Sequence, residues 1–79
     1  MQSLTEVRLL LAVVTLAEEL NFTRAAKQLD ISQSTMTRRI SAVEKRYRIK
    51  LFERDHANVK LTESGRAFVE EARLSLVHK

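Results

Sequence analysis

Residues 22–40 read FTRAAKQLDISQSTMTRRI and decide the fold of this chain, because they place a short helix, a tight turn and a second, basic helix in one segment. This layout is that of a helix-turn-helix, a motif whose second helix reads DNA. Ala25 and Ala26 are small enough for two helices to cross closely. The apolar contacts expected to fix the crossing angle come from Leu29, Ile31, Met36 and Ile40.

The composition indicates one small, mainly helical domain. The chain has 79 residues, of which 44% are hydrophobic, and contains one Gly and no Pro. It therefore has few of the residues that usually mark the turns and loops between strands. It has no Cys, which excludes disulfides and thiolate metal sites and fits a cytoplasmic location. The longest apolar run, residues 9–14, is too short to span a membrane, and the N-terminus lacks the basic stretch of a secretion signal. No membrane partner is therefore expected.

Positive charge is concentrated in the middle of the chain. Residues 24–60 contain ten Lys or Arg and four Asp or Glu, a local balance of +6, whereas the whole chain carries +4. Such a basic segment is typical of a surface that binds a polyanion, because neutralised phosphates release counterions and drive binding. The alternative is a solvated surface that merely keeps the protein soluble. The helix-turn-helix pattern favours nucleic acid.

A first helix, capped by Ser3 or Thr5, is expected to run to about Leu20. Its apolar residues form two stripes, one of Val7, Leu10, Leu11, Val14 and Ala17 and the other of Leu9, Val13, Leu16 and Leu20. The remaining, polar edge of this helix consists of Arg8, Thr15 and Glu19, with Ala12 among them. Two stripes predict burial on two sides, against another helix of this chain, which is the favoured reading, or against a partner subunit.

The third helix, residues 33–47 with Ser32 as its cap, is predicted to separate a core face from a DNA face. The second helix, opened by Asn21 or Thr23, ends near Leu29 and leaves Asp30 in the turn. At 100° per residue, one face of the third helix carries Met36, Ile40, Val43 and Tyr47. The opposite face carries Ser34, Arg38, Ser41 and Lys45.

The chemistry of that opposite face suits the major groove. Short hydroxyl side chains let the helix approach the base edges, while the Arg38 guanidinium reaches O6 and N7 of guanine as a fork. Gln33 and Thr35 lie in the first turn, where Gln has the geometry to pair with adenine. Arg39 and Arg46 project to one side and are better placed for phosphates. The alternative, that Arg38 is an ordinary solvated charge, is disfavoured by its neighbours.

Two short extended pieces follow, residues 50–54 and 59–61, with a polar tip at residues 55–58. This pattern predicts a small β-hairpin, that is, a wing. Arg54 and Lys60 are expected to touch the DNA backbone or the minor groove beside the site. The alternative, compatible with the first, is that the hairpin covers the core with Leu51, Phe52, Val59 and Leu61.

A last helix is expected from Thr62, its cap, to the end of the chain, with Glu63 favourably placed in its first turn. One side carries Phe68, Val69, Ala72 and Leu76, and the other carries Ala67, Leu74 and Val77. The surplus apolar surface predicts a homodimer formed through this helix. The predicted dimer interface consists of Leu74 and Val77 together with Leu9, Val13, Leu16 and Leu20.

The chain resembles the N-terminal part of the LysR-type transcriptional regulators over essentially its whole length, through FTRAAKQLDISQS, TRRISAVEKRYRIKLFER and VKLTESGRAFVEEAR in this order. The resemblance implies a winged helix-turn-helix at residues 1–62, with a three-helix core and a small β wing. It also implies a long linker and dimerisation helix at residues 63–79. The effector-binding domain to which that helix leads in the family is absent from these residues. Also by resemblance, DNA contacts fall on Gln33, Ser34, Thr35, Thr37 and Arg38.

Two positions depart from the family pattern. Ser34 stands where the family usually has Pro, and Arg48 stands where it usually has Gly after the third helix. A Gly there would suit a left-handed helix end, so Arg48 either bears strain or closes the helix differently.

The function expected is sequence-specific binding of double-stranded DNA by a bacterial transcription regulator of this type, acting as a homodimer on an inverted repeat. The full set of predicted DNA contacts is Gln33, Ser34, Thr35, Thr37, Arg38, Ser41, Lys45, Arg46, Arg54 and Lys60. A small-molecule effector is expected only through the absent domain.

No enzyme activity, metal or cofactor is expected, because His56 and His78 are the only histidines, lie far apart, and have no Cys or carboxylate cluster to complete a site. The alternative function is a helical protein-interaction or dimerisation module with an incidental basic face. Its motivation is the pair of apolar faces on the first and last helices.

Overall fold

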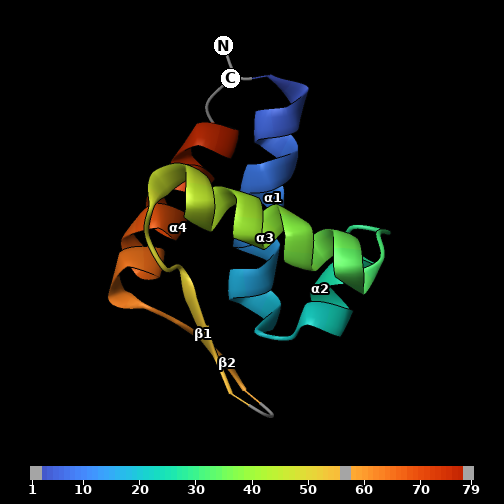
Figure 1. The fold of residues 1–79 in the computed structure, drawn as a ribbon. Coiled ribbons are helices and arrows are strands. Elements are labelled where there is room, and N and C mark those ends of the chain that lie inside the picture. Colours follow the sequence, from blue (N-terminus) through green and yellow to red (C-terminus); the bar gives the residue numbers. More distant parts are fainter. Residues whose placement is uncertain (1–2, 56–57, 78–79) are drawn as a thin grey trace.

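The computed structural model describes residues 3–55 and 58–77 and shows a helical body with one small hairpin (Figure 1). The described helices are α1 (Leu4–Glu19), α2 (Phe22–Gln28), α3 (Gln33–Tyr47) and α4 (Glu63–Val77). Strands β1 (Phe52–Arg54) and β2 (Val59–Leu61) pair antiparallel between α3 and α4 and form the predicted wing. The winged helix-turn-helix architecture is thus confirmed. The predictions for His56, Ala57, His78 and Lys79 lie outside the described residues.

Each helix begins at a side-chain cap that the sequence offers. The side-chain oxygens of Ser3, Asn21, Ser32 and Thr62 accept the backbone N–H three residues on, at 3.1, 2.9, 3.1 and 2.8 Å. These bonds satisfy amides that the first turn leaves without a helical partner. Ser3 and Asn21, rather than Thr5 and Thr23, therefore open α1 and α2.

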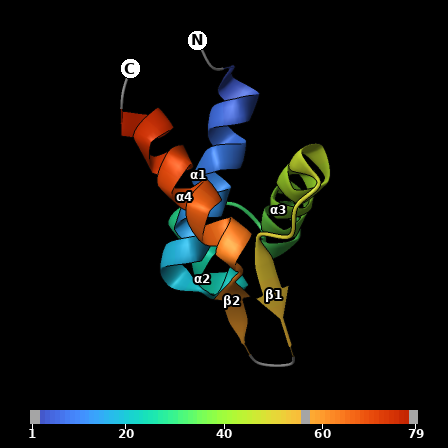
Figure 2. The same ribbon diagram turned by 90° about the vertical axis from the view of Figure 1, so that its left-hand side faces the viewer.

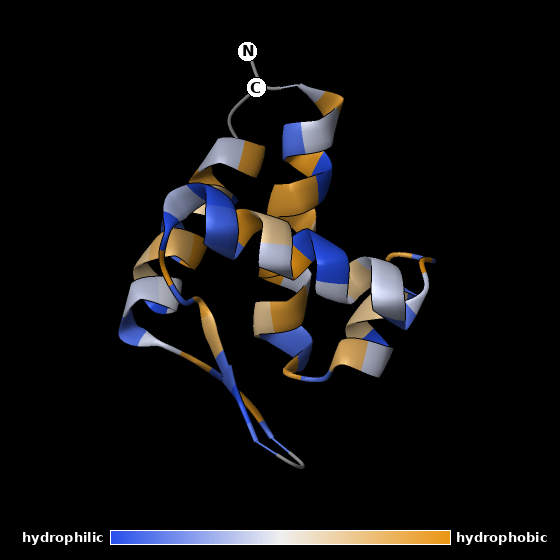
Figure 3. Cartoon of the chain, viewed as in Figure 1, coloured by the Kyte–Doolittle hydropathy of each residue, from blue (hydrophilic) through white to orange (hydrophobic). Residues whose placement is uncertain are grey.

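Helix α1 is the centre of the body, because α2, α3 and α4 all pack on it. Figure 1 shows α3 crossing in front of α1, and Figure 3 shows hydrophobic residues along much of α1. Ala25 and Ala26 are buried, as expected for a close helix crossing. The largest fully buried side chains are Val13, Leu16, Met36, Ile40, Val43, Leu51 and Phe52.

The central place of α1 corrects part of the predicted dimer interface. Val13 and Leu16 have no exposed surface, so neither is available to a second copy. Leu9 is only partly exposed and packs on the core, whereas Leu20 is 44% exposed. Ala12, predicted on the polar edge, is also fully buried. The three helices that surround α1 bury Leu10, Val13 and Leu16 of the two stripes, in agreement with partners inside the chain, whereas Leu11 and Leu20 stay exposed.

Tyr47 is the one residue of the predicted α3 core face that the structure places differently. Met36, Ile40 and Val43 are buried, but Tyr47 is 44% exposed. It lies in the last turn of α3, past the edge of the core, and its ring meets Phe68 of α4 edge-on with centroids 5.1 Å apart.

The wing is fastened to the body at its base. Its register pairs Phe52 with Leu61, Glu53 with Lys60, and Arg54 with Val59. Leu51 and Phe52 are buried, which confirms that the hairpin also covers the core. A Cβ on Gly65 of α4 would lie 2.1 Å from the carbonyl oxygen of Leu51. The single Gly of the chain therefore allows α4 to lie directly against the base of the wing.

Left-handed backbone ends α1 and α3 and shapes the turn after α2. Leu20, Asp30 and Arg48 have φ of 50°, 57° and 57°. Arg48 is therefore a non-Gly residue in the conformation that Gly adopts without penalty. The amides of Arg48 and Ile49 both donate to the carbonyl of Glu44, which closes α3 in the ordinary way despite the Arg.

The N-terminal end of α1 and the C-terminal end of α4 lie at the same end of the molecule, opposite the wing (Figure 2). Within residues 3–55 and 58–77, no helix has the length and apolar character needed to cross a membrane.

Candidate nucleic-acid interface

Helix α3 forms one side of the molecule, and the wing projects beside it. In Figure 2, α3 lies at the edge away from α1 and α4, so its outer face points away from the body. The side chains predicted to face DNA along α3 are all exposed: Gln33, Ser34, Arg38, Ser41 and Lys45. Thr35 and Thr37 are partly exposed. These predicted contacts of α3 are therefore exposed or partly exposed to solvent.

Hydroxyl groups order the first turn of α3. The Ser32 hydroxyl donates to Thr35 Oγ1 at 2.9 Å, and Arg38 Nη2 donates to the same oxygen at 3.2 Å. The Ser34 hydroxyl joins this cluster at 3.2 Å from Ser32 Oγ. Arg38 is thus held along the helix by one N–H, while the guanidinium keeps further donors for a base. Ser34, which departs from the family pattern, adds a hydroxyl to this ordered turn.

Gln33 is tied to the preceding helix. Thr23 Oγ1 of α2 donates to Gln33 Oε1 at 3.2 Å. The hydrogen bond orients the amide relative to α2, and the amide nitrogen keeps its two N–H donors. A pairing with adenine requires both the oxygen and the nitrogen of this amide. The second lone pair of Oε1 is available for that purpose.

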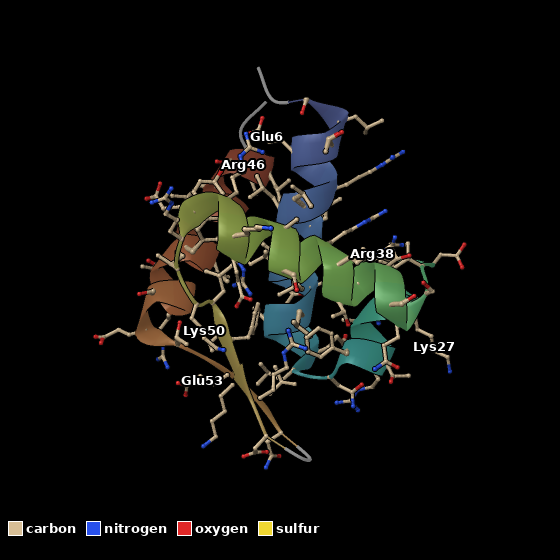
Figure 4. All side chains as sticks on the ribbon, in the orientation of Figure 1. Glu6, Lys27, Arg38, Arg46, Lys50 and Glu53 are labelled. Carbon is tan, nitrogen blue, oxygen red and sulfur yellow. The ribbon has the colours of Figure 1, made fainter. Side chains whose placement is uncertain are left out.

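The arginines on the flank of α3 differ in their surroundings. Arg46 lies 4.0 Å from a carboxylate oxygen of Glu6, and Figure 4 shows the two side by side, well away from Arg38. Its guanidinium also stands 5.9 Å from the centroid of the Tyr47 ring. Surface ion pairs of this kind contribute about 0–1 kcal/mol, so the pair with Glu6 does not prevent Arg46 from reaching a phosphate. Arg39 is partly buried.

The two predicted contacts of the wing lie on its opposite faces, because neighbouring positions along a strand alternate. Lys60 faces the same side as its cross-strand neighbour Glu53. Arg54 faces the other side, where its guanidinium lies 4.6 Å from the centroid of the Phe22 ring of α2. Arg54 therefore fastens the wing to α2, and its remaining donors stay exposed.

Two residues beside this surface, Lys50 and Glu44, were not predicted from the sequence. Lys50 is exposed at the base of the wing (Figure 4), and a hollow that extends from there along the wing is lined by Lys50, Glu53, Arg54, Asp55, Asn58 and Lys60. Glu44 is partly buried and accepts the backbone N–H groups of Leu51 and Phe52 through Oε2, at 2.9 and 3.2 Å. One feature of the sequence could have pointed to Glu44: it is the one acidic residue of α3 and lies beside the core face of that helix.

Exposed apolar side chains also lie on α1 and α4, away from the proposed DNA contacts. Leu74 and Val77 of α4 are 55% and 73% exposed, as predicted for a helix with a second apolar side. Leu4 and Leu11 of α1 are also exposed and were not predicted to belong to an interface. An ion pair of 3.5 Å between Arg73 and Glu18 links the two helices.

Comparisons with known proteins agree with this geometry. The family model for bacterial regulatory helix-turn-helix proteins of the lysR family matches residues 7–66. The HTH-type transcriptional regulator ClcR of Pseudomonas putida is 46% identical over 68 residues, which cover 86% of this chain and 23% of ClcR. TfdS of Cupriavidus pinatubonensis is 46% identical over 71 residues, which cover 90% of this chain and 24% of TfdS. The chain thus spans about a quarter of the length of these curated relatives.

Solved structures of DNA complexes are also similar. The complex of the CbnR DNA-binding domain with DNA superposes with a TM-score of 0.87 at 39% identity, covering 90% of this chain and 82% of that one. The complex of the BenM DNA-binding domain with catB site 1 DNA gives a TM-score of 0.85 at 37% identity, covering 90% and 79%.

Proposed function

Because the chain belongs to the LysR family of bacterial regulatory helix-turn-helix proteins, we propose that it binds double-stranded DNA with sequence specificity as the DNA-binding part of a transcription regulator. The observation that carries the proposal is the outward surface of α3, where Arg38 and Lys45 stand among short polar side chains and the single acidic residue turns toward the wing. A helix with such a surface can enter the major groove without placing a carboxylate against phosphate.

The residues of this surface take different parts in the proposed complex. Base edges are contacted by Arg38, by Gln33 and by the hydroxyls of Ser34, Thr35 and Thr37, which give specificity. Ser41, Lys45 and Arg46 lie farther along α3 and contact phosphates or the groove wall. Lys60 and Arg54 contact the backbone or the minor groove beside the site. Phosphate contacts fix the register of α3, and base contacts choose the sequence.

The chain acts as a two-fold homodimer on an inverted repeat. The exposed Leu74 and Val77 on α4 support this part of the proposal, because apolar surface of this kind marks interaction sites. A symmetric dimer presents two copies of α3 to two half-sites, spaced by about one helical turn of DNA or a multiple of it. Residues 63–79 then serve as the linker and dimerisation helix, and residues 1–62 as the DNA-binding domain.

The remaining parts of the proposal concern the regulator as a whole. A small-molecule effector acts through a region outside these 79 residues, since the curated relatives are about four times as long as the matched part. The regulator works in the cytoplasm, where the chromosome of a bacterium lies, and it controls transcription without being an enzyme.

Selection of bound duplexes from a random DNA pool tests the proposed function. The expected result is one enriched inverted repeat that binds more tightly than a scrambled duplex by about 10³-fold or more, with an affinity that falls steeply as salt rises. Equal affinity for enriched and scrambled duplexes would contradict sequence-specific binding. Failure to bind DNA, together with tight binding to a protein, would favour the alternative of an interaction module.

A further inference from the structure

We propose that Glu44 is a positioning residue for DNA binding, because its carboxylate holds the wing at a fixed angle to α3. The inference rests on the proposed function and adds to it a residue that touches no DNA. Glu44 instead aligns two elements that do, so that the cations of α3 and those of the wing meet the same duplex together.

The geometry at Glu44 carries the first step. One carboxylate oxygen accepts two consecutive backbone N–H groups, from Leu51 at 2.9 Å and Phe52 at 3.2 Å, at the point where β1 begins. Leu51 and Phe52 are themselves buried, so the strand has little freedom to move while the carboxylate holds it.

The backbone of the same residue ends α3. The Glu44 carbonyl accepts the amides of Arg48 and Ile49, so one residue fixes both the end of the helix and the start of the strand. On the far side, Thr62 of the α4 cap donates its backbone N–H to the Leu51 carbonyl at 3.0 Å. Hydrogen bonds therefore hold the base of the wing from both α3 and α4, and those from α3 are made by the Glu44 side chain.

The hydrogen bonds of Glu44 matter for DNA binding because the contacts proposed for α3 and for the wing are far apart in sequence. Arg38 stands in the middle of α3, whereas Lys60 stands in β2. Cations that are held in one geometry bind a rigid duplex together, whereas cations on a loose hairpin lose conformational freedom when they bind. Loss of the Glu44 carboxylate should thus weaken the contribution of the wing and leave that of α3 in place.

The change in charge alone predicts stronger DNA binding, which is the opposite of the result expected from lost positioning. Removing an acidic side chain from a DNA-binding protein raises its positive charge and strengthens its attraction to phosphate. Weaker binding after removal of Glu44 therefore reports lost geometry. Glu53 is a matched control, because it is an exposed acidic residue in the wing itself.

The experiment compares Glu44→Ala, Glu44→Gln and Glu53→Ala on a duplex selected by the wild-type chain, at a temperature where circular dichroism shows each variant fully folded. We expect Glu44→Ala to bind on the order of tenfold more weakly, with a salt slope shallower by about 1 because a wing phosphate contact is lost. Glu44→Gln keeps an oxygen that accepts both amides and should bind within about threefold of wild type. Glu53→Ala should bind as tightly as wild type or more tightly.

A double-mutant cycle separates this role from a general loss of stability. Lys60→Ala should weaken binding in the wild-type background but have little further effect in Glu44→Ala, because the wing is already misplaced. Full additivity of the two changes would overturn the inference, and so would wild-type affinity in Glu44→Ala.

If Glu44→Ala does not fold, Glu44→Asp replaces it. Asp keeps the charge but is one methylene too short to hold both amides in place, so weaker binding by Asp than by Gln supports the inference and the reverse order overturns it. A wild-type chain that selects no duplex would instead refute the proposed function itself.

Discussion

Replacing Arg48 with Gly should stabilise the protein, because Arg48 ends α3 at a φ of 57°. A residue with a Cβ loses about 1–2 kcal/mol in the left-handed conformation. Gly avoids this penalty but gains about 0.5–1 kcal/mol of conformational freedom in the unfolded chain. At the middle of the two ranges, the net effect is an increase of about 0.75 kcal/mol in the free energy of unfolding. For a domain of this size, that corresponds to a rise of about 3–6 °C in the melting temperature.

Thermal unfolding followed by circular dichroism measures this change, and Arg48→Ala is the matched control. Ala removes the same guanidinium but keeps the Cβ, so its melting temperature should stay close to that of wild type. An unchanged or lower melting temperature for Arg48→Gly would refute the strain at this helix end. An equal rise in both variants would assign the effect to the lost charge. DNA affinity should remain within about twofold, since Arg48 is not among the proposed contacts.

Four further predictions concern binding, packing and assembly. Arg38→Ala should weaken binding to the selected duplex by about 1–3 kcal/mol and relax the preference at one base pair per half-site; unchanged discrimination in a competition titration would remove Arg38 from base recognition. Arg46→Ala should instead weaken binding to specific and scrambled duplexes alike and make the salt slope shallower by about 1. Gly65→Ala should lower the free energy of unfolding by about 1–3 kcal/mol in urea titrations, because its Cβ would lie 2.1 Å from the Leu51 carbonyl oxygen; wild-type stability would show that α4 moves away at no cost. Sedimentation equilibrium should show a concentration-dependent dimer that Leu74→Glu combined with Val77→Glu abolishes, whereas a wild type that stays monomeric at high concentration would contradict the homodimer.

Local patterns predicted most of the fold because they depend on neighbours in the sequence. The caps at Ser32 and Thr62 were read correctly, since capping is a matter of one side chain and the amide three residues on. The buried positions Met36, Ile40 and Val43 followed from the period of the helix. The exposed positions of α3 followed from the same helical period.

The errors occurred where distant parts of the chain meet. Val13 and Leu16 were assigned to a dimer interface because the sequence shows a second apolar stripe but not the three helices that cover α1. Glu44 resembles an ordinary helix charge until β1 is seen to begin beside it. Arg54 stays a predicted DNA contact, but the sequence did not show that its guanidinium also lies over the Phe22 ring, because that depends on how the wing lies against α2.

The distribution of left-handed residues also bears on the lifetime of the protein in a cell. The only Gly lies inside α4 at a contact that excludes a side chain, while Leu20, Asp30 and Arg48 hold the positive φ values at three turns. The left-handed backbone at each of these three residues lowers the free-energy difference between the folded chain and the open forms that proteases cleave. A change of about 1–2 kcal/mol in that margin alters cellular abundance several-fold. Substitutions at these turns would therefore tune how much regulator is present without touching the surface that reads DNA.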